Sequence, residues 1–139
     1  MRLISSLLTL TDRLLPPAIV SAHCDLPCGV YNPVQALVEA ESVKACQEKY
    51  QGNDDHDFRT RALLIKEERA DLVKHHLWVL WTDYFTPAHL EKFPQLHQIF
   101  WTATKEAGLA KRSQDPEQGQ KLLDAIAEID KIFWETKKA

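Results

Sequence analysis

The sequence has little of what several protein classes require. It contains only four glycines and three cysteines among 139 residues, and Lys plus Arg (17) does not exceed Asp plus Glu (20). Few glycines argue against a turn-rich β protein, and three cysteines are too few for a disulfide framework. A net charge of −3 lacks the basic excess of a nucleic-acid binder, and no apolar run reaches the roughly 18–20 residues of a transmembrane helix. We therefore expect one globular domain whose partners include neither nucleic acid nor membrane.

Residues 1–22 differ from the rest of the chain. They hold only three charged residues and end in Val20-Ser21-Ala22, which is typical of a leader segment that is removed. As a secretory signal the match is imperfect, because Asp12-Arg13 interrupts the apolar stretch and Pro16-Pro17 follows it. The segment could be an export signal, an N-terminal arm, or a propeptide removed for another reason.

Cap residues and prolines mark where helices begin in the remainder. Asn32-Pro33 begins a helix that is predicted to reach about Tyr50, and Asn53-Asp54-Asp55 begins a second that reaches about Tyr84. We expect a short helical turn over 87–92, a third helix over 94–110 that frays at Gly108, and a fourth after Asp115-Pro116. Four amphipathic helices with short connections predict an all-α, up-down-up-down four-helix bundle.

The apolar spacing also predicts which face of each helix is buried. The stripe expected in the second helix includes Arg69 and His76, and a buried guanidinium requires a partner. The expected inner faces are Ala36, Glu39, Val43, Cys46 and Tyr50; then Phe58, Ala62, Ile65, Arg69, Leu72, His76 and Val79; then Leu96, Ile99, Phe100, Ala103 and Ala107; and last Leu122, Ile126, Ile129 and Phe133.

The stretch with the most distinctive chemistry is His23-Cys24-Asp25-Leu26-Pro27-Cys28. Two cysteines at this spacing fit a disulfide in an exported, non-catalytic helical module, or a zinc site if further ligands lie elsewhere. Cys46 is better interpreted as a small buried residue. The other histidines, His75-His76, His89 and His97, are interpreted as surface or hydrogen-bonded core residues, because their spacing does not converge on the cysteines.

A different site becomes possible if the chain is cut after Ala22. His23 would then have a free α-amine, which could join the Cys24 amide nitrogen and the thiolates of Cys24 and Cys28 in a square, with the imidazole on the axis. Nitrogen and sulfur donors in a square suit Ni(II) or Cu(II) rather than tetrahedral Zn(II). Two thiolates and an anionic amide stabilise a higher oxidation state, which suits one-electron cycling of nickel. The site cannot form in the uncut chain, where the His23 nitrogen is an ordinary amide.

The segment His23-Cys24-Asp25-Leu26-Pro27-Cys28-Gly29-Val30-Tyr31 resembles the nickel hook of nickel-containing superoxide dismutases, and the likeness extends over 23–139. The resemblance implies a four-helix bundle with an N-terminal metal-binding hook and one nickel ion per subunit. It also implies disproportionation of superoxide to oxygen and hydrogen peroxide. A maturation peptidase would remove residues 1–22 as a propeptide, and the domain 23–139 would assemble as a homohexamer. The family's intracellular members make the cytoplasm the expected location.

The resemblance also implies roles for single residues close to the metal. His23, Cys24 and Cys28 would be the metal ligands. Tyr31 would guard the open side of the nickel and hold an anion or a water there, although a tyrosine at this place could also serve as an aromatic cap on the first helix. Asp25 would shape the hook by accepting backbone hydrogen bonds.

Residues further along the chain match the family's positions around the hook. Glu39 and Arg69 match the pair that holds the axial imidazole, although they could equally form a plain structural ion pair. Asp83 and Tyr84 match positions near the site. Residues 23–139 contain 15 basic and 19 acidic residues, a net charge of −4 that opposes an anionic substrate. Lysines near the hook would have to offset this charge, and the candidates are Lys111, Lys131 and Lys137.

Overall fold

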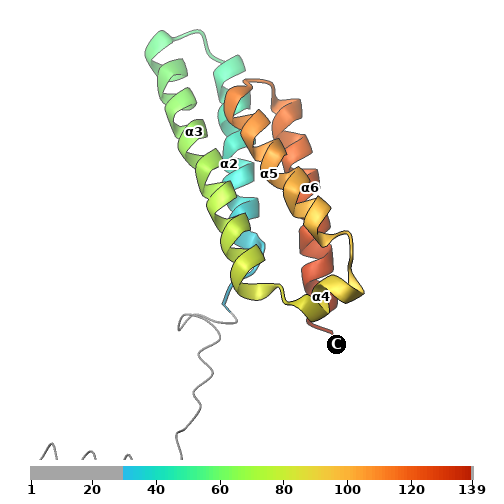
Figure 1. The fold of residues 1–139 in the computed structure, drawn as a ribbon. Coiled ribbons are helices and arrows are strands. Elements are labelled where there is room, and N and C mark those ends of the chain that lie inside the picture. The colour runs from blue at the N-terminus through green and yellow to red at the C-terminus, as the bar shows by residue number, and fades with distance from the viewer. Residues whose placement is uncertain (1–29, 139) are drawn as a thin grey trace, which may run out of the picture.

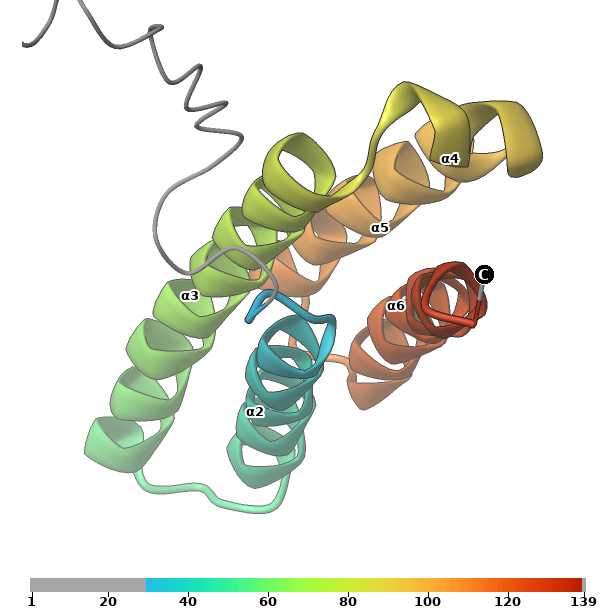
Figure 2. The same cartoon turned by 90° about the horizontal axis from the view of Figure 1, so that it is seen from below.

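The computed structural model describes residues 30–138, and these form an antiparallel bundle of helices (Figure 1). Four long helices run side by side: α2 (Val34–Gln51), α3 (His56–Val79), α5 (Leu96–Arg112) and α6 (Pro116–Thr136). The short α4 (Pro87–Lys92) lies across one end, and Figure 2 shows the four long helices as the corners of a square. The predicted four-helix bundle is therefore confirmed. None of the described helices is long and apolar enough to span a membrane.

Side-chain caps begin α3 and α6 at the predicted places, whereas α5 begins at Leu96, two residues later than predicted and without such a cap. Asp55 Oδ1 accepts a hydrogen bond from Phe58 N at 2.7 Å, and Asp115 Oδ1 accepts one from Glu117 N at 3.0 Å. The predicted fraying at Gly108 is wrong, because α5 continues through this glycine to Arg112. The helix persists there because its buried alanines continue beyond Gly108, to Ala110.

The second long helix reaches Tyr84 as predicted, but its last turn is not α-helical. After Val79 the chain forms one π-helical turn, Leu80–Tyr84, which Phe85 N closes by donating to Leu80 O at 3.4 Å. Leu80 and Phe85 are both buried, so the wider turn keeps two large apolar side chains in the core before the chain crosses to α4. Thr86 then caps α4, with Pro87 as its first residue, as the sequence predicted for 87–92.

The inner face predicted for α3 is largely wrong. The buried residues are Ala62, Lys66, Ala70, Val73 and Leu77, whereas Phe58 is 38% exposed and Ile65 is 40% exposed. Of the predicted stripe only Ala62 is buried, because the helix is rotated so that Ala70, Val73 and Leu77 face the core. The buried face of α2 also contains alanines, Ala36 and Ala40, and alanine allows two helices to approach closely.

The buried faces predicted for the other helices agree better with the structure. In α5 and α6 the predicted stripes are buried, except that Ile99 is only half-buried. In α2, Ala36 and Val43 are buried as predicted, but Glu39, Cys46 and Tyr50 are half-buried, and the core side of this helix includes Ala40 and Gln47 instead.

Two buried polar side chains fix the connection between α5 and α6. Lys66 is 1% exposed, and its Nζ donates to Ser113 O at 2.7 Å. Gln47 Nε2 donates to the same carbonyl at 3.1 Å and to Ala110 O at 3.2 Å. Burial lowers the pKa of Lys66, because the charged form loses its hydration. These contacts lie at the end of the bundle opposite the first turn of α2.

Candidate metal centre

The predicted metal ligands lie just before the described part of the chain. His23, Cys24 and Cys28, together with Asp25, fall outside residues 30–138. Among residues 30–138, no group of three or more His, Cys, Asp or Glu side chains is placed to hold a metal ion. The bundle itself therefore offers no competing cluster of this kind, and the described residues of interest are those around the start of α2.

The chain joins the bundle at the end where α2 begins and α3 finishes (Figures 1 and 2). Tyr31 is half-buried and packs against the edge of the hydrophobic core. Asn32 Oδ1 accepts a hydrogen bond from Val34 N at 3.0 Å, and Pro33 is buried. These contacts fix the start of α2 against the bundle.

Glu39 and Arg69 form a direct ion pair between α2 and α3. Arg69 Nη1 lies 3.1 Å from Glu39 Oε2 and 3.3 Å from Oε1, so one nitrogen donates to both carboxylate oxygens. The Glu39 side chain is only 14% exposed, while that of Arg69 is 39% exposed. The hydrogen bond from Arg69 to Glu39 raises the pKa of the guanidinium. The carboxylate is thus held in place while part of the guanidinium faces outward.

His76 also belongs to the surroundings of this pair. It is half-buried on α3, two helical turns after Arg69, and its ring meets that of His75 edge-on at 5.7 Å. Burial and the neighbouring His75 lower the pKa of His76, whereas the charge of Glu39 acts in the opposite direction. From the sequence, His76 was interpreted as a surface or hydrogen-bonded core histidine. Its seven-residue spacing from Arg69 places both residues on one side of a helix, and this could have indicated that His76 lies near the Glu39–Arg69 pair.

Tyr84 and Asp83 lie on the π-helical turn. Tyr84 Oη is 2.6 Å from Thr136 Oγ1, and its ring packs on Phe133, which joins this turn to the end of α6. Lys137 lies over the Tyr84 ring, with Nζ 4.6 Å from the centroid. Asp83 is exposed and accepts a hydrogen bond from Thr82 Oγ1 at 2.8 Å. Tyr84 is therefore held by structural contacts at this end of the bundle.

The comparison with known proteins decides the family. Residues 18–137 match the nickel-containing superoxide dismutase family. The chain belongs to this family. It is 64% identical to a superoxide dismutase [Ni] of Streptomyces coelicolor and 63% identical to one of Streptomyces seoulensis. Each comparison spans 129 residues, which is 92% of this chain and 98% of the relative.

Solved structures of the family agree with the fold. A native nickel superoxide dismutase matches with a TM-score of 0.80 and 66% identity, over 84% of this chain and all of that one. A nickel-containing structure that corresponds to the state after partial X-ray-induced reduction matches with a TM-score of 0.81 and 64% identity, over the same shares. The resemblance drawn from the hook motif and the rest of 23–139 is thus confirmed at the level of the family and the fold.

Proposed function

We propose that this chain is the precursor of a nickel superoxide dismutase. Removal of residues 1–22 would leave a domain, 23–139, that begins at His23. The family membership supports this proposal, and so does the order of donors in the sequence, because a free-amine histidine followed by Cys24 and Cys28 provides nitrogen and sulfur ligands suited to square-planar nickel. One nickel ion per subunit would supply one-electron cycling between Ni(II) and Ni(III), so that one superoxide would lose an electron and leave as oxygen while a second would gain one electron and two protons to become hydrogen peroxide.

The protein residues have distinct tasks in this proposal. His23, Cys24 and Cys28 would hold the metal, and Asp25 would hold the loop between the two cysteines by accepting backbone hydrogen bonds. Tyr31 would guard the open side, where its phenol can donate a hydrogen bond to the incoming anion or to a water. Only two residues separate Cys28 from Tyr31, so the chain keeps their Cα atoms within about 11 Å of each other.

The Glu39–Arg69 pair would position the axial imidazole of His23. A carboxylate that is 14% exposed and already fixed by a guanidinium can accept a hydrogen bond from an imidazole N–H without losing its own orientation. Such an outer partner fixes the tautomer and the direction of a histidine ligand, and its loss commonly costs 10- to 100-fold in activity or metal affinity. Glu39 belongs to the second turn of α2, only eight residues after Tyr31, which supports this proposed role.

The decisive experiment is N-terminal sequencing of active protein combined with elemental analysis. We expect His23 as the first residue and one nickel per subunit. Active protein that begins at Met1, or active protein with zinc in place of nickel, would refute the proposal. Cys24→Ser and Cys28→Ser should each abolish nickel binding and dismutase activity. Cys46→Ser is the matched control, because Cys46 lies on α2 within the bundle and should leave both properties unchanged.

The subunits are proposed to assemble as a homohexamer, which is consistent with the apolar side chains that one subunit leaves in water. Phe58, Leu64 and Ile65 of α3 are exposed, as are Val34 and Val38 of α2. Sedimentation equilibrium should give six times the mass of the mature subunit, and Ile65→Lys should dissociate the assembly. A monomer of full activity would contradict this part of the proposal.

The enzyme is proposed to be matured and to act in the cytoplasm, because residues 1–22 match a secretory signal poorly. Asp12-Arg13 interrupts the apolar stretch of that segment. Cell fractionation should place the mature protein with cytoplasmic markers, together with a peptidase activity that cuts after Ala22. Mature protein found only outside the cell would contradict this location.

A further inference from the structure

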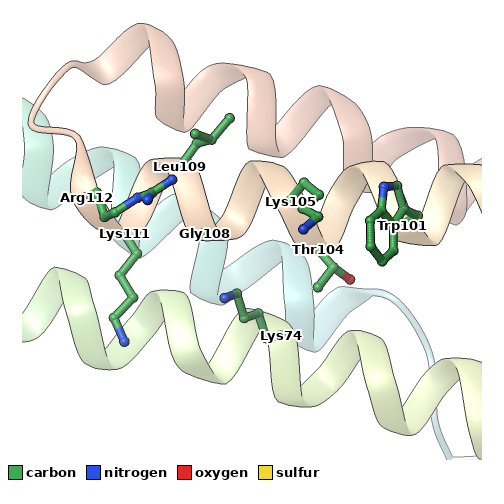
Figure 3. Close-up of a pocket in the computed structure, with 8 residues that line it drawn as sticks. All are labelled: Lys74, Trp101, Thr104, Lys105, Gly108, Leu109, Lys111 and Arg112. Carbon is green, nitrogen blue, oxygen red and sulfur yellow. The ribbon is translucent and has the colours of Figure 1, made fainter.

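A basic groove runs between α3 and α5, on a part of the molecule that the proposed chemistry does not use (Figure 3). Its volume is about 590 Å³, and its charged lining is entirely cationic: Lys74 from α3, with Lys105, Lys111 and Arg112 from α5. The chain as a whole has a net charge of −3, so the positive charge of this groove is opposite in sign to the net charge of the protein.

Three of these four cations have no carboxylate partner among residues 30–138. Lys111 is the exception, because its Nζ lies 2.6 Å from Asp71 Oδ2. Lys74, Lys105 and Arg112 form no ion pair within the described part of the chain, whereas Arg59 and Arg69 each do. Three unpaired positive charges along one groove favour a ligand that has several negative charges.

Gly108 shapes the floor of the groove beside Lys74. The Lys74 Nζ and Cε atoms lie 3.4 Å and 3.8 Å from the point that a β-carbon on Gly108 would occupy. The half-buried Lys74 side chain therefore lies against α5 at ordinary contact distance, and Figure 3 shows its amine in the groove beside this glycine. An ammonium group in that position is partly shielded from water, which strengthens its attraction for an anion.

The other end of the groove is aromatic. Trp101 is 55% exposed, and Lys105 Nζ lies 4.4 Å from the centroid of its ring. Next to it is a smaller hollow of about 230 Å³, whose lining includes Trp78, Trp81 and Phe100 and which shares Trp101 with the basic groove. Trp78 is also exposed, so two indoles offer surface on which a planar group can stack.

We propose that this combined surface binds a nucleoside triphosphate. The phosphates would lie on Lys74, Lys105 and Arg112, and the base would stack at the end formed by Trp78 and Trp101. The eleven residue steps from Trp101 to Arg112 span about 16 Å of helix, which matches the length of such a nucleotide. A monocarboxylate would leave most of these cations without an anionic partner, and inorganic phosphate has no planar group to stack on the indoles.

Isothermal titration of the assembled, nickel-loaded protein tests the proposal, with ATP, tripolyphosphate and adenosine as the three probes. We expect saturable ATP binding that is tighter than that of tripolyphosphate, and adenosine should bind least. Lys74→Met and Arg112→Met should each weaken ATP binding about tenfold, which is the effect of one charge-assisted hydrogen bond. Lys121→Met, an exposed lysine of α6 outside the groove, is the matched control and should leave binding unchanged.

Trp101→Leu separates base recognition from phosphate recognition. It should weaken ATP binding at least about fivefold, the low end of a base-stacking contribution, and change tripolyphosphate binding less than about twofold. Circular dichroism checks that each variant is folded. The proposal is overturned if assembled protein does not bind ATP, as when another subunit covers the groove. Equal loss of both ligands in Trp101→Leu, or ATP binding that survives loss of Lys74 and Arg112, would also overturn it.

Discussion

Replacement of Gly119 by alanine should destabilise the bundle, because α6 leaves no room for a methyl group at this position. A β-carbon there would collide with Gln47 Oε1 and would lie 2.8 Å from Lys44 Cβ and 2.9 Å from Lys44 Cα. The Lys44 Cα is backbone, so the strain is relieved only if α2 and α6 move apart and the Gln47 side chain also moves. Movement of Gln47 would weaken its hydrogen bonds to the carbonyls of Ala110 and Ser113.

The expected size of the effect follows from three contributions. Overpacking of a tight contact costs about 1–3 kcal/mol, and loss of one buried hydrogen bond costs about 1 kcal/mol more. Alanine regains about 1 kcal/mol because it favours the helix more than glycine does. Gly119→Ala should therefore lower the free energy of unfolding by about 1–3 kcal/mol, as measured by urea denaturation of metal-free protein at one fixed concentration.

Gly108→Ala is the matched control for this prediction. Gly108 is also inside a long helix, but its new β-carbon would meet only the end of the Lys74 side chain, at 3.4 Å, and that end can swing away. This variant should be as stable as the parent or more stable by up to about 1 kcal/mol. If Gly119→Ala proved as stable as Gly108→Ala, the close approach of α2 and α6 at Gln47 would not be a packing constraint.

Three other predictions concern ionisable side chains. Because the folded-state pKa of Lys66 is lowered below 10.5, the folded protein binds fewer protons than the unfolded chain as pH approaches that value, and its stability gains from a rise in pH. Lys66→Met should abolish this rise of the unfolding free energy with pH, as measured by denaturation curves recorded from pH 7 to 10. An equal rise in the variant would contradict the prediction. Burial raises the pKa of the Cys46 thiol above 9.0, so iodoacetamide should modify Cys46 more slowly at pH 8 in folded than in unfolded protein, as peptide mass mapping would show. Glu39→Gln should lower dismutase activity about tenfold with nickel retained, whereas Glu41→Gln, an exposed neighbour on α2, should not.

The helix starts could be predicted from sequence because caps are local. Asp55 and Asp115 each cap a helix through a backbone N–H two or three residues away, and Pro87 and Pro116 begin helices in both the prediction and the structure. No long-range contact is needed for these features. The π-helical turn at Leu80–Tyr84 was not predictable in the same way, because it depends on the burial of side chains by distant helices.

The rotation of α3 about its axis could not be predicted, because its apolar residues cover more than one face. Phe58 and Ile65 belong to the predicted stripe, and Ala70, Val73 and Leu77 define another beside it. The choice between them depends on how closely α2 approaches, which alanines on both helices determine. The basic groove escaped prediction for a related reason: Lys74 and Lys105 are distant in sequence and meet only when α3 packs on α5.

The corrected rotation of α3 also bears on the role proposed for Arg69. At the centre of the buried stripe, the guanidinium would be expensive to desolvate, and the charge of Glu39 would be needed to offset that cost. At the edge, where the structure places it, Arg69 keeps 39% of its side chain exposed and still fixes a carboxylate that is 14% exposed. That asymmetry suits the proposed task of orienting a third group at the helix boundary better than it suits a pair that only stabilises the core.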